Sequence, residues 1–244
     1  MKYYGVHACL ALFEKRPQDL IRVYLDETNI RDFKKVLKWC AEHKKAYHLI
    51  PSSELDKVSD SVHHEGVCFL AKALPILKEA DLLPAILNKK GKICLLYLDG
   101  VQNPHNIGSI LRTAAHFGVT HILGAKGRLP FLTPSACRIA KGGAEAVSLV
   151  MLENPEETLK KLKGEGFSLI GTSSHQGTSL YAFTYPPRSI LAMGGETTGL
   201  TPECSSLMSH QIEIPGTGEV ESLNVSVATA LCLGEYCRQH QGPQ

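Results

Sequence analysis

The chain has 244 residues, with 26 Lys and Arg against 24 Asp and Glu, and a formal net charge of +2 at pH 7. This length suits one large domain or two small ones, and the longest apolar runs are too short to span a bilayer. The first twenty residues contain Glu14, Lys15 and Arg16 and lack the apolar core of a signal peptide, so we expect a cytoplasmic protein without membrane contact.

The first 73 residues predict a compact α/β module. Their apolar spacing indicates three helices, over residues 6–14, 32–42 and 52–58, and three strands, over residues 22–25, 46–50 and 67–71. Residues 74–92 contain Pro75, Pro84 and a polar run at 88–92, a composition typical of a linker, with some helix predicted around residues 76–87. We therefore predict an N-terminal domain over 1–73 and a linker over 74–92.

From Ile93 onward strand and helix patterns alternate regularly, which predicts a second domain over residues 93–244. The predicted strands are 93–98, 120–123, 168–171, 189–192 and 211–214, and the predicted helices are 106–117, 135–141, 155–163 and 225–239. Continuous apolar runs are typical of strands that are covered on both faces. The pattern therefore predicts an α/β fold with a parallel sheet.

The distribution of charge is uneven. Residues 1–92 hold sixteen Lys and Arg against twelve Asp and Glu, whereas residues 93–244 hold ten against twelve. Nucleic-acid binding draws much of its affinity from Lys and Arg at phosphates, so the basic half suits RNA docking. A solvated helix face explains the same lysines, and the charge run alone favours that interpretation.

The eight cysteines occur singly, without a Cys-x-x-Cys pair. A metal cluster needs paired spacing, so we predict reduced core cysteines and no metal site.

The segment 103–115 follows the first strand of the second domain. Asn103 is a suitable helix cap and Pro104 suits the first helical position. Arg112 lies outside the apolar stripe of this helix. It is either an ordinary surface side chain or a guanidinium that binds a phosphate through two nitrogens. Further along, Arg138 and Lys141 lie one turn apart, and phosphate contact and a solvated helix face are equally good interpretations of this pair.

The segment 193–200 reads Met-Gly-Gly-Glu-Thr-Thr-Gly-Leu. Gly194 and Gly195 permit a tight turn and a close backbone approach to a ligand. The segment has neither the Gly-Lys-Ser/Thr ending of a phosphate-binding P-loop nor the Gly-x-Gly-x-x-Gly of a dinucleotide site. Both alternatives are therefore disfavoured.

The segment 214–227 contains Pro215, Gly216 and Gly218, and then Ser222 and Asn224 before the last predicted helix. Ser and Asn at a helix start are typical caps, and on sequence alone capping is the favoured role. All three segments follow predicted strands, and open α/β sheets bind ligands at the carboxyl ends of their strands.

In this order the three segments resemble the signature motifs of the SpoU (TrmH) family of RNA ribose 2′-O-methyltransferases, within the SPOUT superfamily, over about residues 93–240. Residues 4–12 and 63–67 resemble the substrate-binding domain that some members carry in front. The resemblance implies a C-terminal parallel-sheet SPOUT domain with a deep trefoil knot, preceded by a small α/β domain like a ribosomal protein.

The resemblance also implies a set of site residues. The catalytic positions would be Asn106, Arg112, Glu196, Ser222 and Asn224, and the S-adenosylmethionine-binding positions Gly194, Ile214 and Leu223. The chain departs from the family pattern at Asn103, where Asp is usual, and at Thr197, where Gly is usual.

The resemblance predicts methyl transfer from S-adenosylmethionine to a ribose 2′-hydroxyl of structured RNA by a homodimer, with Arg112 reaching the partner's site. Ribosomal RNA is the favoured substrate, with transfer RNA as the alternative. Two other hypotheses stay open, a non-catalytic RNA-binding protein of the same fold and an α/β enzyme that uses NAD or another nucleotide.

Overall fold

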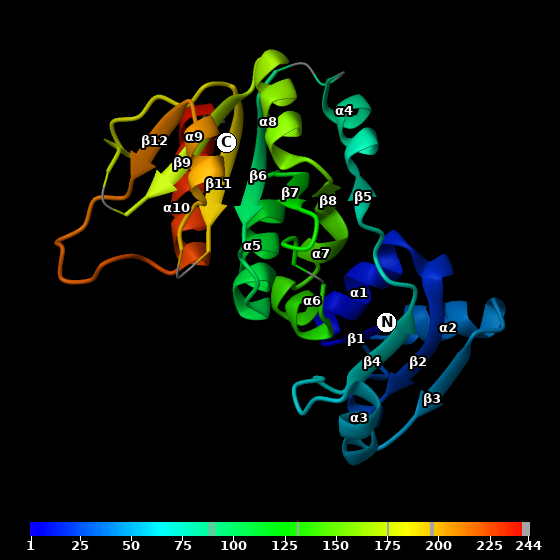
Figure 1. The fold of residues 1–244 in the computed structure, drawn as a ribbon. Helices are drawn as coiled ribbons and strands as arrows, with labels where there is room; N and C mark the ends of the chain where they lie inside the picture. Colours follow the sequence, from blue (N-terminus) through cyan, green and yellow to red (C-terminus); the bar gives the residue numbers. More distant parts are fainter. Residues whose placement is uncertain (88, 90, 131, 175, 196–197, 241–244) are drawn as a thin grey trace.

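The structure is a computed structural model that describes residues 1–87, 89, 91–130, 132–174, 176–195 and 198–240. The described residues form two β-sheets, a small one in the N-terminal part and a large one in the C-terminal part (Figure 1). No helix among the described residues is long and apolar enough to cross a membrane.

The small sheet has the strand order β1-β4-β2-β3 and is antiparallel except for the β2–β3 pair. Its strands are β1 (Lys2–Tyr4), β2 (Leu20–Leu25), β3 (Ala46–Leu49) and β4 (Val67–Ala71), and its helices are α1 (Val6–Lys15), α2 (Lys34–Glu42) and α3 (Ser52–Ser59). The three predicted helices and three predicted strands are all present, with ends shifted by up to two residues. The sequence pattern missed β1, because three residues are too short to show a periodicity.

The large sheet is parallel throughout, with the order β10-β12-β9-β11-β6-β7-β8-β5, which confirms the predicted fold class. Its strands are β5 (Leu77–Lys78), β6 (Ile93–Asp99), β7 (His121–Ala125), β8 (Ser148–Leu152), β9 (Ser168–Ser173), β10 (Thr178–Ser179), β11 (Arg188–Gly194) and β12 (His210–Glu213). All seven residues of β6 are buried, as expected for a central strand covered on both faces.

Helices cover both faces of this sheet (Figure 1). They are α4 (Glu79–Leu87), α5 (Pro104–His116), α6 (Pro134–Ala140), α7 (Gly143–Ala146), α8 (Pro155–Gly164), α9 (Pro202–Leu207) and α10 (Val225–His240). The sequence pattern did not predict α7, α9, β8 or the two-residue strands. The run that forms β8 is apolar without alternation, so periodicity alone does not distinguish a buried strand from a buried helix there.

The predicted linker contributes to the large sheet. β5 pairs with β8, and Leu82 and Ile86 of α4 are fully buried in the cluster that covers one face of the sheet. The predicted domain limits at residues 73 and 92, and the trefoil knot, stay predictions.

The two parts of the chain share one hydrophobic core. α1 packs on α6 and α7, β1 packs on α6, and the same cluster joins Leu12 and Val23 to Cys137 and Ala144 (Figure 1). All eight cysteines are free and buried. Burial and the nearby Glu145 carboxylate raise the pKa of Cys137 to about 12, so this thiol stays protonated at neutral pH.

A buried ion pair crosses the same junction. The Arg16 guanidinium donates from Nε to Glu145 Oε2 at 2.8 Å and from a second nitrogen to Glu145 Oε1 at 3.0 Å. The two side chains are only 9% and 5% exposed. Burial lowers the pKa of Arg16, but the hydrogen bonds and charge of Glu145 outweigh burial, and the net shift is upward. The pair therefore fixes α7 to the end of α1.

Breaking this pair is expected to destabilise the protein. Glu145→Gln should lower the free energy of unfolding by about 3 kcal/mol, because the buried Arg16 then loses its two-oxygen partner and keeps only the single carboxylate contact to Asp19 at 3.3 Å. Glu153→Gln is the matched control, since the Lys126–Glu153 pair at 2.8 Å is about 60% exposed on both sides and should matter by less than about 1 kcal/mol. Urea unfolding measures both values, and equal losses would contradict the assignment.

Candidate functional site

The candidate site lies at the carboxyl edge of the large sheet. β11 ends at Gly194, which is in register with Asp99 at the end of β6. By the registers of β9 with β11 and β12, Gly194 is also level with Glu213, the last residue of β12. Since strands lie about 4.8 Å apart, the two chain segments leave the sheet within about 10 Å of each other. Gly194 and Ile214 therefore belong to neighbouring loops on one edge.

A hydrogen bond joins the first and third motifs. Asn224 Nδ2 donates to Asn106 Oδ1 at 2.9 Å, across 118 residues of sequence. Asn106 is only 6% exposed, near the start of α5, where Asn103 caps the helix by accepting from the His105 backbone N–H. Asn224 Oδ1 accepts from the backbone N–H and hydroxyl of Ser226, so the same side chain also caps α10. The Asn224 side chain therefore both caps α10 and holds Asn106 at the site.

The glycines of the second motif allow a close contact between backbones. A Cβ on Gly194 would lie 2.1 Å from the Gly199 carbonyl carbon and 2.4 Å from the Leu200 nitrogen. The Gly195 N–H donates to the Asp99 carbonyl at 3.0 Å, which ties this loop to the end of β6. Glu196 and Thr197 lie outside the described residues.

Asp99 is a site residue that sequence reasoning missed. Its carboxylate is 2% exposed, accepts from the Thr201 N–H at 2.7 Å and hydroxyl at 2.8 Å, and pairs with Arg128 at 3.2 Å. Burial and the Asp99 charge together raise the pKa of the neighbouring Cys204 thiol to about 12. The available signal was an acidic residue at the end of an otherwise apolar strand. Asp99 fixes both ends of the second-motif loop.

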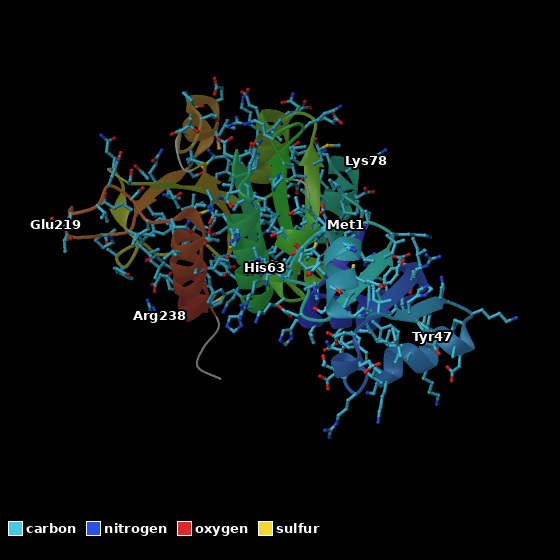
Figure 2. All side chains as sticks on the ribbon, turned by 90° about the horizontal axis from the view of Figure 1, so that it is seen from below. Met1, Tyr47, His63, Lys78, Glu219 and Arg238 are labelled. Atoms are coloured by element: carbon cyan, nitrogen blue, oxygen red, sulfur yellow. The ribbon has the colours of Figure 1, made fainter. Side chains whose placement is uncertain are left out.

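The third-motif loop, residues 215–224, is exposed along its whole length. Figure 2 shows Glu219 of this loop at one end of the molecule and Tyr47 of β3 at the other. Ile214 is half-buried at the loop's start, and Leu223 is 45% exposed near its end. Ser222 is exposed and makes no hydrogen bond with another described side chain. The structure thus brings Gly194, Ile214 and Asn224 to one edge, with Leu223 and Ser222 on the outer part of the loop.

Arg112 lies elsewhere on α5. It is six residues after Asn106, about 9 Å along the helix axis and about 120° around it. It lines a cavity of about 660 Å³ between α5, α6, α7 and α10. Neither this cavity nor a second one of about 310 Å³ beside Asp99 and Arg128 is lined by Gly194, Ile214 or Leu223. Within this chain, the structure therefore separates Arg112 from the Asn106–Asn224 pair.

Comparison with known proteins finds two family matches. Residues 94–234 match the SpoU rRNA Methylase family, and residues 3–77 match a domain described as RNA 2′-O ribose methyltransferase substrate binding.

Individual relatives agree. The chain is 36% identical to the uncharacterized tRNA/rRNA methyltransferase YfiF of Escherichia coli over 98% of this chain and 68% of that protein. It is 32% identical to the 23S rRNA (guanosine-2′-O-)-methyltransferase RlmB of Acinetobacter baylyi over 98% of each. Among solved structures, the SpoU methyltransferase AviRb of Streptomyces viridochromogenes with AdoMet has a TM-score of 0.80, at 21% identity over 98% of this chain and 90% of that chain.

The contact at Gly194 predicts a local steric effect. Gly194→Ala is expected to lower the free energy of unfolding by about 2 kcal/mol or to displace the loop, because its Cβ meets backbone atoms that have no rotamer to change. Gly216→Ala, in the third-motif loop, has no atom within 4 Å of its Cβ and should be close to neutral. Thermal unfolding of both variants tests this, and a neutral Gly194→Ala would contradict so close an approach of the two backbones.

Proposed function

Because the chain belongs to the SpoU rRNA methylase family, and is therefore an S-adenosylmethionine-dependent RNA ribose 2′-O-methyltransferase, we propose that its target is a guanosine of 23S ribosomal RNA. The relatives named for that activity are 32–34% identical over 95% or more of their own length. The Asn106–Asn224 hydrogen bond carries the assignment of the site, because it unites two distant motifs at the edge where such a donor would bind. Transfer RNA is the alternative substrate.

The carboxyl edge of the sheet fits S-adenosylmethionine. A Cβ on Gly199, Gly216 or Gly218 would meet no atom within 4 Å, so these loops offer exposed backbone beside open space. Ile214 and Leu223 supply apolar surface for an adenine ring. When bound, the donor supplies an electrophilic methyl group on its sulfonium. Gly194 and Ile214 would hold it by backbone contacts, with Leu223 closing over the base.

The protein's task is then to align the ribose hydroxyl and stabilise the charge that develops on it. Asn106 and Asn224 fix each other through their hydrogen bond and would position the hydroxyl, and by resemblance to the family Ser222 and Glu196 would take part with them. Because a guanidinium is a permanent cation, the role of Arg112 is to hold the adjacent phosphate and to stabilise the forming alkoxide.

The separation of Arg112 from the Asn106–Asn224 pair supports a homodimer in which Arg112 serves the partner's site. Val227 and Leu231 lie four residues apart on α10, form an apolar stripe on its surface and are 48% and 37% exposed. Such a stripe on one helix suits burial against a second copy. Ala230, beside this stripe, lines the Arg112 cavity, so a copy seated there would bring its own donor loops to that cavity.

The N-terminal module, predicted over residues 1–73, would dock the RNA and set its position relative to the site. Its lysines on α2 are exposed while Val36 and Cys40 pack inward. The core shared by the module and the large sheet would hold this docking surface rigidly. A cytoplasmic location accords with a ribosomal RNA substrate.

The enzyme assignment predicts methyl transfer that depends on both halves of the site. Arg112→Ala and Asn106→Ala should each lower the rate of tritium transfer to 23S RNA by about 10²–10³-fold, because each removes a group that acts on the transition state. Lys126→Ala, on an exposed ion pair, is the control and should keep the wild-type rate.

Mapping 2′-O-methylation in RNA from a deletion strain identifies the nucleotide. Loss of a methyl group from transfer RNA alone would replace the proposed substrate. Binding of RNA without transfer to any RNA would reject the activity.

The dimer proposal predicts complementation between two inactive variants. In a mixed dimer of Arg112→Ala with Asn106→Ala, one site lacks both side chains and the other has neither defect, if Arg112 acts across the interface. Equal mixing after exchange of subunits should therefore restore about a quarter of wild-type transfer. If Arg112 acts within its own protomer, every site carries one defect and mixing restores nothing.

A further inference from the structure

The cavity beside Arg112 is cationic and has no acidic lining residue. Its charged or titratable lining residues are Arg112, Lys141 and His116, and the rest of its wall is Thr113, Ala115, Phe117, Ala140, Gly142, Gly143, Ala146 and Ala230. Among the described residues, neither Arg112 nor Lys141 has an ion pair or a side-chain hydrogen bond. Two unpaired cations at one cavity form a site for an anion.

Lys141 has an unusual backbone for its residue type. It ends α6 in the left-handed region, with φ 46° and ψ 45°. Only three other described residues that are not glycine have positive φ, namely Lys44, Asp60 and Glu65. Glycine adopts this conformation without the steric cost that a side chain with a Cβ brings, so a lysine here carries a local backbone penalty.

The neighbouring glycines place Lys141 next to Arg112. A Cβ on Gly143 would lie 2.9 Å from the Arg112 Cα and 2.7 Å from the Leu111 carbonyl oxygen, so the start of α7 rests directly on α5. A Cβ on Gly142 would lie 2.9 Å from the Ala11 Cβ of α1. The backbone just after Lys141 therefore passes between Arg112 and the N-terminal module.

Arg138, one turn before Lys141, makes an ion pair and does not line the cavity. It pairs with Glu65 of the N-terminal module at 3.6 Å. Glu65 also accepts from the Val6 N–H at 3.0 Å. Of the two cations that the sequence offered as phosphate contacts, Arg138 thus belongs to the junction, and Lys141 is the one that faces the cavity.

We propose that this cavity seats an RNA phosphodiester next to the target ribose, and that Lys141 is its second cationic contact beside Arg112. This inference rests on the proposed function and adds a substrate-positioning residue to it. The wall of Ala and Gly residues leaves room for a sugar-phosphate backbone, and the two cations oppose its charge. RNA held by the N-terminal module would reach the cavity past α1.

The test uses the full-length protein with Lys141→Gly, Lys141→Asn and Lys141→Arg. Gly and Asn both accept the left-handed conformation and both remove the charge, whereas Arg keeps the charge. Lys141→Gly and Lys141→Asn should raise the KM for 23S RNA about tenfold and reduce the slope of log affinity against log salt by about one. Lys141→Arg should restore both values, and the KM for S-adenosylmethionine should stay unchanged in all three.

The thermal stability of Lys141→Gly should not fall along with its RNA binding. Relief of the backbone penalty in Lys141→Gly is expected to keep Tm or raise it by about 2–4 °C while RNA binding weakens. An unchanged KM for RNA in Lys141→Gly and Lys141→Asn would overturn the proposal. A raised KM together with a lowered Tm in these variants would also overturn it. Neither result would affect the proposed function, which fails if the wild-type protein transfers no methyl group to 23S RNA.

Discussion

The parallel direction of all eight strands in the large sheet is the constraint on which the site depends. Because every strand ends at the same edge, segments far apart in sequence leave the sheet side by side. The loop after β11 and the loop after β12 meet there, and α5 begins there after β6. The hydrogen bond between Asn106 and Asn224 then closes the edge across 118 residues. The same side chains cap or begin helices, so local folding and site formation stabilise each other.

Asp99 shows how the scaffold supports this edge. Its carbonyl oxygen accepts from Gly195 and its carboxylate accepts twice from Thr201, so one residue of β6 fixes both ends of the glycine loop. Arg128 compensates the buried charge on Asp99. The described ends of this loop, at Gly195 and Thr201, are therefore held at the carboxyl edge of the sheet.

The N-terminal module and the large sheet are joined by packing and by a buried ion pair. Their shared core and the buried Arg16–Glu145 pair leave little freedom for the module to move relative to α7. α7 in turn forms part of the wall beside Arg112. A substrate held by the module would therefore meet the Arg112 cavity at a fixed separation, which suits an enzyme that must select one ribose in a large folded RNA. The exposed apolar stripe on α10 lies next to the same cavity, because Ala230 of this helix lines its wall.

Local sequence by itself determined much of the fold. The apolar runs gave the main strands and their parallel arrangement, since a strand covered on both faces must be apolar at every position. Asn103 and Pro104 specified the start of α5, because capping depends only on neighbouring residues. The three motifs indicated the family. Short elements such as β1 and α7 were missed, because a few residues carry no measurable period.

Only the tertiary structure decided which polar groups meet. Strand order is absent from local periodicity, so neither the Asn106–Asn224 contact nor the role of Asp99 could be read from spacing. The direction of Arg112 depends on the phase of α5 relative to α6, α7 and α10, and that phase places it away from Asn106. Packing also decides that Arg138 pairs with Glu65 at the junction while Lys141 lines the cavity. The contacts that a side chain makes are set by how whole elements pack, and this packing depends on residues distributed over the entire chain.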